Sequence, residues 1–356
     1  MKEWKISRAD AGQPLKKFCM KYLTAAPQSF IYKMLRKKNI VLNDKKSDGS
    51  DILKEGDIIK FYLSDETIEQ FSRGSDEFKN NAAPERKNDP ETRITSKKTK
   101  KNAGKHDRKS EEKLRDTDIL YRDSDYLIIN KPAGLLSQKA EAGDYSAIEA
   151  VRAYLSRLYP EAEMQDRFAL FQPACVNRLD RNTSGILLFG LTVKGAAVLS
   201  EMLRDRRVKK EYVAVVKGNA RLKGEYVSLF MKDERTNKVT LTDVNTGNRN
   251  NLHHDAERNK PQEIRNRFYP IRYDREKDIS LVRIELLTGK SHQIRAQLSH
   301  LGHPIIGDVK YGGKSPLAKR QLLHAEKIGF PVDERLGPLS GKEIRAELPT
   351  DMNRFK

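Results

Sequence analysis

The sequence contains only two cysteines, Cys19 and Cys175, which lie far apart in a chain of 356 residues. Their number and separation exclude a disulfide framework, a zinc ribbon and a vicinal redox pair, so each is expected to be a small buried residue in a reducing compartment. Long apolar runs are also missing, and the segment MKEWKISRADAGQPLKKF lacks the apolar core of a signal peptide. We therefore expect a cytoplasmic protein.

Acidic residues are few relative to basic ones. The chain has 50 Asp and Glu against 69 Lys and Arg, which gives a formal net charge of +19. Such an excess attracts polyanions, so nucleic acid is the first partner to consider. The length allows two or three domains.

The first sixty residues have the pattern of a compact mixed α/β unit. QPLKKFCMKYL predicts one helix, and SFIYKMLRKKN predicts a second helix that opens at Ser29. IVLND predicts a short strand and a turn, and ILKEGDIIKFYL predicts a pair of strands broken at Gly56-Asp57. The expected inward positions are Leu15, Phe18, Cys19 and Tyr22 or Leu23 in the first helix, and Ile31, Met34 and Leu35 in the second.

A basic cluster lies on the outward face of the second predicted helix and just after it, formed by Lys33, Arg36, Lys37 and Lys38. A solvated helix face is the alternative to RNA contact, and the net charge favours RNA. SFIYKMLRKKNIVLND followed by LKEGDIIKF resembles an S4 domain, a small RNA-binding module. The resemblance implies an S4 RNA-binding domain at residues 1–63.

Residues 64–115 have few aliphatic side chains and many Lys, Asn, Asp, Glu and Ser residues. Too little apolar surface is available to offset chain entropy, so we predict a charged flexible linker. Residues 116–356 then alternate between helical patterns and strongly β-prone segments, of which YLIIN and ILLFGLT predict strands. They predict an α+β domain built around a large, mainly antiparallel sheet, with a surface excursion near 245–266.

In the second domain, the segment NRLDRNTSGILLFG places Asp180 between two arginines, Arg178 and Arg181. Both arginines would favour the ionised carboxylate, which suits electrostatic or nucleophilic work better than proton donation. A structural ion pair at the start of a strand is the alternative.

Four segments together resemble the RluA family of pseudouridine synthases, in the same order and at similar separations: YLIINKPAGLLSQ, NRLDRNTSGILLFG, KKEYVAVVKG and LLTGKSHQIRAQLSHLGHPIIGDVKYG. The resemblance implies a pseudouridine synthase fold. It also implies that Asp180 is the catalytic aspartate, that Tyr212 lies against the target base, and that Arg295 pairs with the aspartate. Many members have His and Asp where this chain has Asn177 and Asn182, which affects only the expected substrate contacts.

The implied reaction breaks the N1–C1′ bond of uridine and joins C5 to C1′, so it needs no cofactor. Attack on C1′, attack on the uracil ring and formation of a glycal all remain open as routes. The target base must leave its helix, and Tyr212 offers a stacking face for it. Further RNA contacts are expected from Arg178, Arg181, Arg206, Lys209, Lys210, His292 and Gln293.

Several alternatives stay open at the level of sequence. His292, His300 and His303 are close in sequence, but no acid or cysteine nearby completes a usual ligand set, so we expect no metal. A non-catalytic ribosome-assembly factor on the same fold, a synthase acting on tRNA and a glycoside hydrolase are the competing functions, and the last usually needs two carboxylates. We favour a monomer that acts on large-subunit ribosomal RNA.

Overall fold

The computed structural model describes residues 1–72, 114–141, 143–168, 171–233, 238–243 and 261–355. The chain divides into two compact units. The first contains the N-terminal residues together with Glu161–Phe171, and the second contains Leu114–Pro160 and Gln172–Lys356. None of the helices in these described ranges is both long and apolar enough to cross a membrane.

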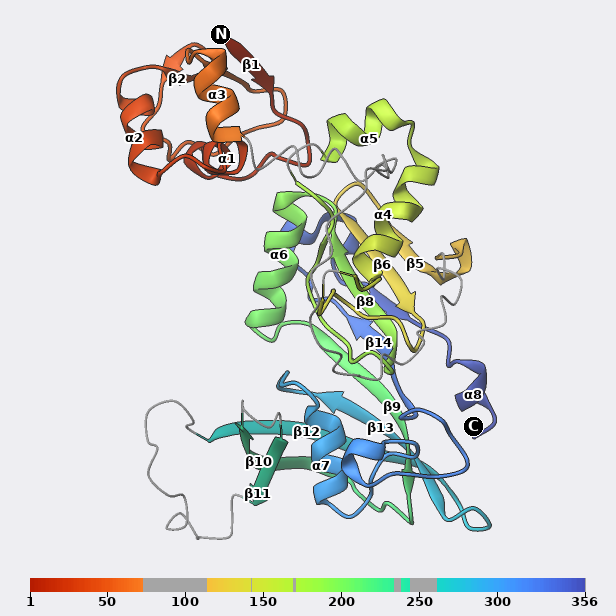
Figure 1. Ribbon diagram of the computed structural model, residues 1–356. Helices are drawn as coiled ribbons and strands as arrows, with labels where there is room; N and C mark the ends of the chain where they lie inside the picture. The colour runs from red at the N-terminus through yellow and green to blue at the C-terminus, as the bar shows by residue number, and fades with distance from the viewer. Residues whose placement is uncertain (73–113, 142, 169–170, 234–237, 244–260, 356) are drawn as a thin grey trace, which may run out of the picture. The chain divides into compact units, whose positions relative to one another are not determined.

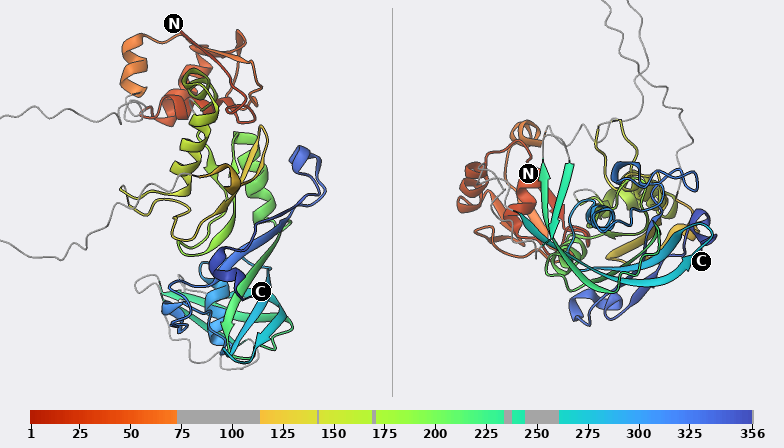
Figure 2. Two further views of the ribbon diagram at one scale, coloured as in Figure 1. Left: turned by 90° about the vertical axis from the view of Figure 1, so that its right-hand side faces the viewer. Right: turned by 90° about the horizontal axis from the view of Figure 1, so that it is seen from below.

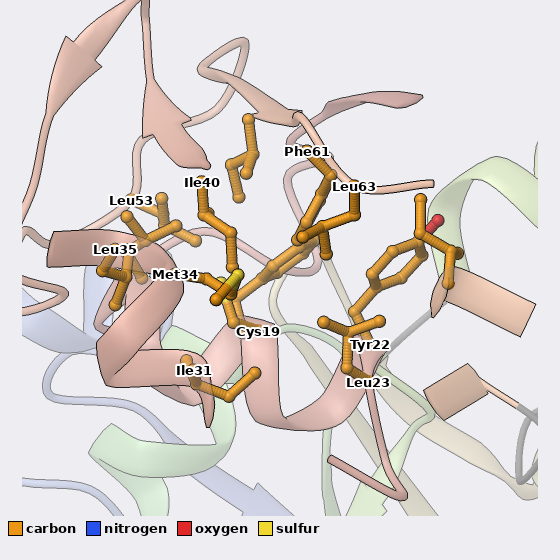
Figure 3. Packing of buried hydrophobic residues seen from close by; sticks show 14 of the residues in the cluster. Cys19, Tyr22, Leu23, Ile31, Met34, Leu35, Ile40, Leu53, Phe61 and Leu63 are labelled. Atoms are coloured by element: carbon orange, nitrogen blue, oxygen red, sulfur yellow. The ribbon is translucent and has the colours of Figure 1, made fainter. Parts of the chain in front are cut away.

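The first unit packs helices against a small antiparallel sheet with the strand order β1-β4-β2-β3. Its core, shown in Figure 3, contains every inward residue expected from the helical spacing, including Cys19, Tyr22 and Ile31. Trp4 and Tyr22 add an edge-to-face aromatic contact with ring centroids 5.0 Å apart. The elements are β1 (Lys2–Lys5), α1 (Leu15–Tyr22), α2 (Gln28–Arg36), β2 (Ile40–Leu42), β3 (Lys45–Lys46), β4 (Ile58–Phe61) and α3 (Asp65–Ser72).

Three local predictions for this unit were wrong. Helix α2 begins at Gln28 after Pro27, whose fixed φ suits a helix start, and Ser29 does not cap it. Only the second half of the expected strand pair forms a strand, because Gly56 has a φ of +87° and turns the chain. Residues 65–72 of the expected linker instead form α3, which packs its Ile68 into the core. Residues 73–113 of that linker lie outside the described residues.

The second unit contains, within the described residues, an eleven-stranded sheet with the main order β11-β10-β12-β13-β9-β14-β8-β6-β5. Its described strand pairs are antiparallel except β14 with β8, which confirms the predicted α+β class. The strands are β5 (Ile119–Arg122), β6 (Tyr126–Lys131), β7 (Ala174–Cys175), β8 (Ser184–Gly190), β9 (Lys209–Lys217), β10 (Gly224–Asp233), β11 (Lys238–Asp243), β12 (Gln262–Asp274), β13 (Ile279–Leu286), β14 (Leu323–Gly329) and β15 (Glu343–Arg345).

Strand β9 connects the two halves of this sheet, as Figure 1 shows. One half contains β5, β6, β8 and β14, and the other contains β10 to β13. The long strands β12 and β13 are strongly curved (Figure 2), and their register shifts between Pro270 and Arg272. Proline has no N–H to donate to the ladder, so a bulge and a bend at this point follow from the sequence.

The helices of the second unit follow their capping signals. Helix α4 (Ala147–Leu158) is capped by Ser146 and Glu149, and α6 (Val193–Arg204) is capped by Thr192. Sequence patterns did not predict α7 (Gln293–His300), α8 (Thr350–Asn353) or the strands β10 and β14 of this unit, nor α5 (Glu161–Phe168) of the first unit. Strand β12 already begins at Gln262, so the end of the expected surface excursion is wrong, and residues 244–260 lie outside the described residues.

Candidate active site

A cleft of ≈ 1130 Å³ opens in the second unit beside β9. It is lined by the loop between β7 and β8, by the first turn of α7 and the loop before it, and by residues of β9 and α6. Its lining includes Asp180, Tyr212, Arg295 and His292. The fold therefore brings together three sequence motifs that are far apart in the chain.

Asp180 is presented by the loop that joins β7 to β8, and its side chain is 26% exposed. The Ser137 hydroxyl donates to the Leu179 carbonyl at 2.9 Å and accepts from the Leu179 amide at 2.9 Å. On the other side of the aspartate, the Lys131 ammonium donates to the carbonyl of Arg181 at 3.1 Å. Two residues of the first motif thus fix the backbone on both sides of the carboxylate.

Lys131 is fully buried, which is unusual for a lysine. Its Nζ donates to the carbonyls of Pro132, Leu135 and Arg181 at 2.8–3.1 Å, so each ammonium proton has an acceptor. Burial lowers the pKa of Lys131 to about 7, and the nearby Asp180 carboxylate opposes this shift. Lys131 is a structural part of the site that the sequence did not reveal.

Arg295 lies on α7 and is buried between two carboxylates. Its Nη1 donates to Asp180 Oδ2 at 2.6 Å, and its Nε and Nη2 donate to the two oxygens of Asp308 at 2.6 and 2.8 Å. Burial opposes the charge, but the hydrogen bonds to Asp308 and Asp180 raise the pKa of the guanidinium above its usual value. Asp308 is only 1% exposed, so Arg295 is held rigidly while its third contact faces the cleft.

Within the described residues, Asp180 forms an ion pair with Arg295, and its other oxygen lies 3.7 Å from Nε2 of His292. Neither of the flanking arginines is its partner, contrary to the sequence expectation. Arg178 is exposed, and Arg181 lies 4.0 Å from Asp144, measured from Nη2 to Oδ1.

His292 lies just before α7 in a left-handed backbone conformation, with a φ of +58°. Its Nε2 is 3.7 Å from Asp180 Oδ1, and its Nδ1 shares a hydrogen bond of 3.0 Å with the hydroxyl of Tyr311. Burial lowers the pKa of His292, although the charge of Asp180 opposes this. The imidazole therefore touches the carboxylate as well as lining the cleft.

Tyr212 reaches the cleft because residues alternate along β9. Tyr212 and Lys210 line the cleft, whereas Lys209 pairs with Glu211 at 3.0 Å on the other face of the strand. Burial, assisted by the charge of Asp180, raises the pKa of Tyr212 above its usual value. Its hydroxyl is therefore protonated at neutral pH. The predicted RNA contact by Lys209 is not supported, because its side chain points away from the cleft.

Gln293 also differs from the expected RNA contact, because it is 2% exposed and its amide is fully used inside the protein. Its Oε1 accepts from Thr288 Oγ1 and from the Lys290 amide, and its Nε2 donates to the Arg265 carbonyl and to Asn266 Oδ1. This network fastens the start of α7 to β12.

The remaining predicted RNA contacts fall into two groups. Arg178, Arg181, Arg206 and Lys210 line the cleft. Lys33, Arg36, Lys37 and Lys38 are exposed on the first unit, on and after α2. Burial and the nearby Arg206 lower the pKa of Lys210, which means that they disfavour its charged form. The negative charge of a phosphate beside Lys210 would stabilise the charged ammonium.

Comparison with known proteins identifies the family. The chain is 32% identical over 232 residues to the uncharacterized RNA pseudouridine synthase YhcT of Bacillus subtilis, and the alignment covers 65% of this chain and 68% of that protein. The chain belongs to the RNA pseudouridine synthase family. The family described as RNA pseudouridylate synthase matches residues 125–300, which include the Asp180, Tyr212 and Arg295 segments.

Two further comparisons extend this result. The ribosomal large subunit pseudouridine synthase C of Haemophilus ducreyi is 28% identical over 363 residues, covering 96% of this chain and 95% of that protein. The structure of human RNA pseudouridylate synthase domain containing 4 shares the fold, with a TM-score of 0.51 and 21% identity, over 66% of this chain and 92% of that one. The family resemblance noted in the sequence is confirmed, and the protein is an RNA pseudouridine synthase, an isomerase.

Proposed function

We propose that this synthase converts uridine to pseudouridine in large-subunit ribosomal RNA and that Asp180 is its catalytic carboxylate. The observation that carries the proposal is the arrangement Asp180–Arg295–Asp308 at the wall of the cleft, in which Arg295 and Asp308 are buried. Relatives that span nearly the whole chain bear the name ribosomal large subunit pseudouridine synthase C, which supports the choice of RNA.

The geometry suits a carboxylate that acts in its charged form. Arg295 donates to Oδ2, whereas Oδ1 faces His292 at a longer distance of 3.7 Å. Oδ1 is therefore the better placed oxygen for attack on the nucleotide or for removal of a sugar proton. Because Arg295 is fixed by Asp308, its positive charge needs no rearrangement as the reaction proceeds.

Tyr212 would hold the flipped uracil. Its ring lines the cleft, and its raised pKa keeps the hydroxyl protonated, so it can donate a hydrogen bond to the base. Stacking of a base on an aromatic ring contributes about 1–3 kcal/mol, which offsets part of the cost of unstacking the nucleotide. Arg178, Arg181, Arg206 and Lys210 would bind the phosphates next to the flipped nucleotide.

The basic cluster of Lys33, Arg36, Lys37 and Lys38 would supply a second RNA contact. These side chains are exposed and lie on one short helix and the turn after it, as an RNA-binding S4 domain would require. The S4 assignment for residues 1–63 stays a prediction.

The test uses purified protein and transcribed RNA. Wild-type protein and Asp180→Asn are incubated with large-subunit ribosomal RNA or with a tRNA mixture, and pseudouridine is mapped by carbodiimide-dependent primer extension. We expect site-specific pseudouridine in ribosomal RNA with the wild type and none with Asp180→Asn, because the amide keeps the shape and loses the charge. Modification of tRNA alone would establish the other substrate. RNA binding without pseudouridine in any RNA would favour the assembly-factor function.

A further inference from the structure

Arg320 lies outside the cleft, immediately before Gln321, which lines it. Its Nη1 donates to the carbonyl of Asn182 at 3.0 Å and to the carbonyl of Gln321 at 2.9 Å. Its Nε and Nη2 form a bidentate pair with Asp351, at 2.7 Å each. One guanidinium thus joins the C-terminal helix α8 to the loop that carries Asp180, which lies two residues before Asn182.

The Asn182 contact completes a series of hydrogen bonds along this loop. The carbonyl of Leu179 accepts from Ser137, that of Asp180 accepts from the Thr183 amide, and that of Arg181 accepts from Lys131 and the Gly134 amide. Four consecutive carbonyls, from Leu179 to Asn182, therefore have donors. For the last of them the side-chain donor is Arg320, which is 138 residues away in sequence.

The backbone of Arg320 also contacts the loop that holds Arg295, the partner of Asp180. Gly307 has a φ of +82°, and a Cβ atom at this position would collide with the carbonyl of Arg320. Gly307 directly precedes Asp308, the residue that fixes Arg295. Arg320 is therefore in contact with the loop of Asp180 through its side chain and with the loop of Asp308 through its backbone.

Asp351 is well placed to hold the guanidinium. Its neighbour Met352 is fully buried, and Phe355 is 8% exposed; both pack in a core cluster with Val213 and Val215 of β9. This packing fixes α8 on the strand that carries Tyr212. Arg320 is mostly buried, with 14% of its side chain exposed, so its fork is constrained by the contacts on both sides.

We propose that Arg320, held by Asp351, is a positioning residue that sets the orientation of Asp180 against Arg295. The proposal rests on the catalytic role of Asp180 stated above. Loss of the Asn182 contact would free the end of the loop without removing a side chain that lines the cleft. A displacement of about 1 Å at a reacting group can cost about a hundredfold in rate.

The test is the single-turnover rate of pseudouridine formation at saturating ribosomal RNA, with RNA affinity measured separately. For Arg320→Met we expect a rate ten- to a hundredfold below wild type and a dissociation constant within twofold of wild type. The matched control is Arg335→Met, because Arg335 also makes a bidentate pair, with Asp333, but its side-chain contacts with Asp333 and Glu201 involve neither the Asp180 loop nor the lining of the cleft. This control should keep its rate within twofold of wild type.

A second pair of variants covers the case in which Arg320→Met folds poorly. Asp351 is 42% exposed, so Asp351→Asn should fold, and we expect its rate to fall at least threefold with unchanged affinity. Asp351→Glu keeps the carboxylate and should return the rate to within twofold of wild type. If Asp351 had only a structural role, Asp351→Asn and Asp351→Glu would both have a lower melting temperature. Their single-turnover rates would then not differ in the way described.

The outcomes separate this proposal from the proposed function. If Asp180→Asn is inactive while Arg320→Met and Asp351→Asn both react at wild-type rates, the positioning role is wrong and the catalytic role of Asp180 stands. A loss of RNA affinity in parallel with the rate would also overturn it, because Arg320 would then act in binding. If Asp180→Asn itself remains active, the proposed catalytic role fails first.

Discussion

Arg295 donates to Asp180 and Asp308 at the same time, with N–O distances of 2.6 Å to the nearest oxygen of each. The two contacts differ in their surroundings, because the Asp180 side chain is 26% exposed and that of Asp308 is 1% exposed. The buried pair with Asp308 therefore fixes Arg295, and the pair with Asp180 leaves the Asp180 carboxylate facing the cleft. Activity and stability should depend on the two carboxylates in different ways.

Replacing Arg295 by Met should abolish pseudouridine formation and also destabilise the fold. The buried Asp308 carboxylate would lose its partner, which typically costs about 3–5 kcal/mol in the free energy of unfolding. Adding Asp308→Asn should recover much of this stability, because the unpaired buried charge is removed, but should not recover activity. Denaturant unfolding and single-turnover assays on the single and double variants check both statements. Active Arg295→Met protein would show that the arginine is not part of the catalytic machinery.

Tyr212→Phe separates stacking from the hydroxyl group. The ring should still hold the uracil, so RNA affinity should change less than threefold. The single-turnover rate should fall by about 10²–10⁴, which is the usual size of a contribution from positioned proton transfer. Tyr212→Ala should lower both the RNA affinity and the single-turnover rate. An unchanged rate in Tyr212→Phe would leave stacking as the function of this residue.

The sequence predicted the strands with continuous apolar or β-branched residues well, such as β8, in which all seven residues are buried. It predicted the Asp180–Arg295 pair only through family resemblance, because local patterns carry no information on contacts between residues 115 positions apart. Lys131 and Asp308 were missed for the same reason, although both lie in the quoted motifs. Strand β14 was missed because His324, Glu326 and Lys327 interrupt its apolar pattern.

His324 should make the fold sensitive to acid. It is fully buried, with Nδ1 2.9 Å from Ser184 Oγ and Nε2 3.3 Å from the Ala346 carbonyl, and burial lowers its pKa to about 4. In the unfolded chain its pKa is about 6.5, so the unfolded state binds the proton first as the pH falls. Its contribution to stability is therefore present above about pH 6.5 and is lost between about pH 6.5 and 4.

The measurement is the free energy of unfolding from pH 7.5 to 4 for wild type and His324→Gln. The wild type should lose up to about 1.4 kcal/mol more per pH unit than the variant within this window. Ser184→Ala is the control, because it removes the hydroxyl contact and leaves the buried imidazole to titrate. Parallel curves for wild type and His324→Gln would mean that the histidine is not titrating as a buried group.

The last prediction concerns the basic cluster after and on α2. If Lys33 and Arg36 contact RNA phosphates, the double variant Lys33→Gln/Arg36→Gln should bind ribosomal RNA more weakly and with a shallower dependence on salt. The control double variant, Lys2→Gln/Lys5→Gln, removes the same charge from exposed positions on β1.

Each lost phosphate contact lowers the slope of log affinity against log salt by about 0.7–0.9, so the first variant should lose about 1.4–1.8 and the control should match wild type. Both variants should keep the wild-type single-turnover rate at saturating RNA, because Asp180, Tyr212 and Arg295 all belong to the second unit. Affinity over a salt series and pseudouridine formation on the same RNA provide the two readouts. Equal slopes in the two variants would show that the charge of the whole protein, rather than the α2 cluster, attracts the RNA. A reduced saturated rate in the first variant alone would show that the cluster contributes to catalysis as well as to binding.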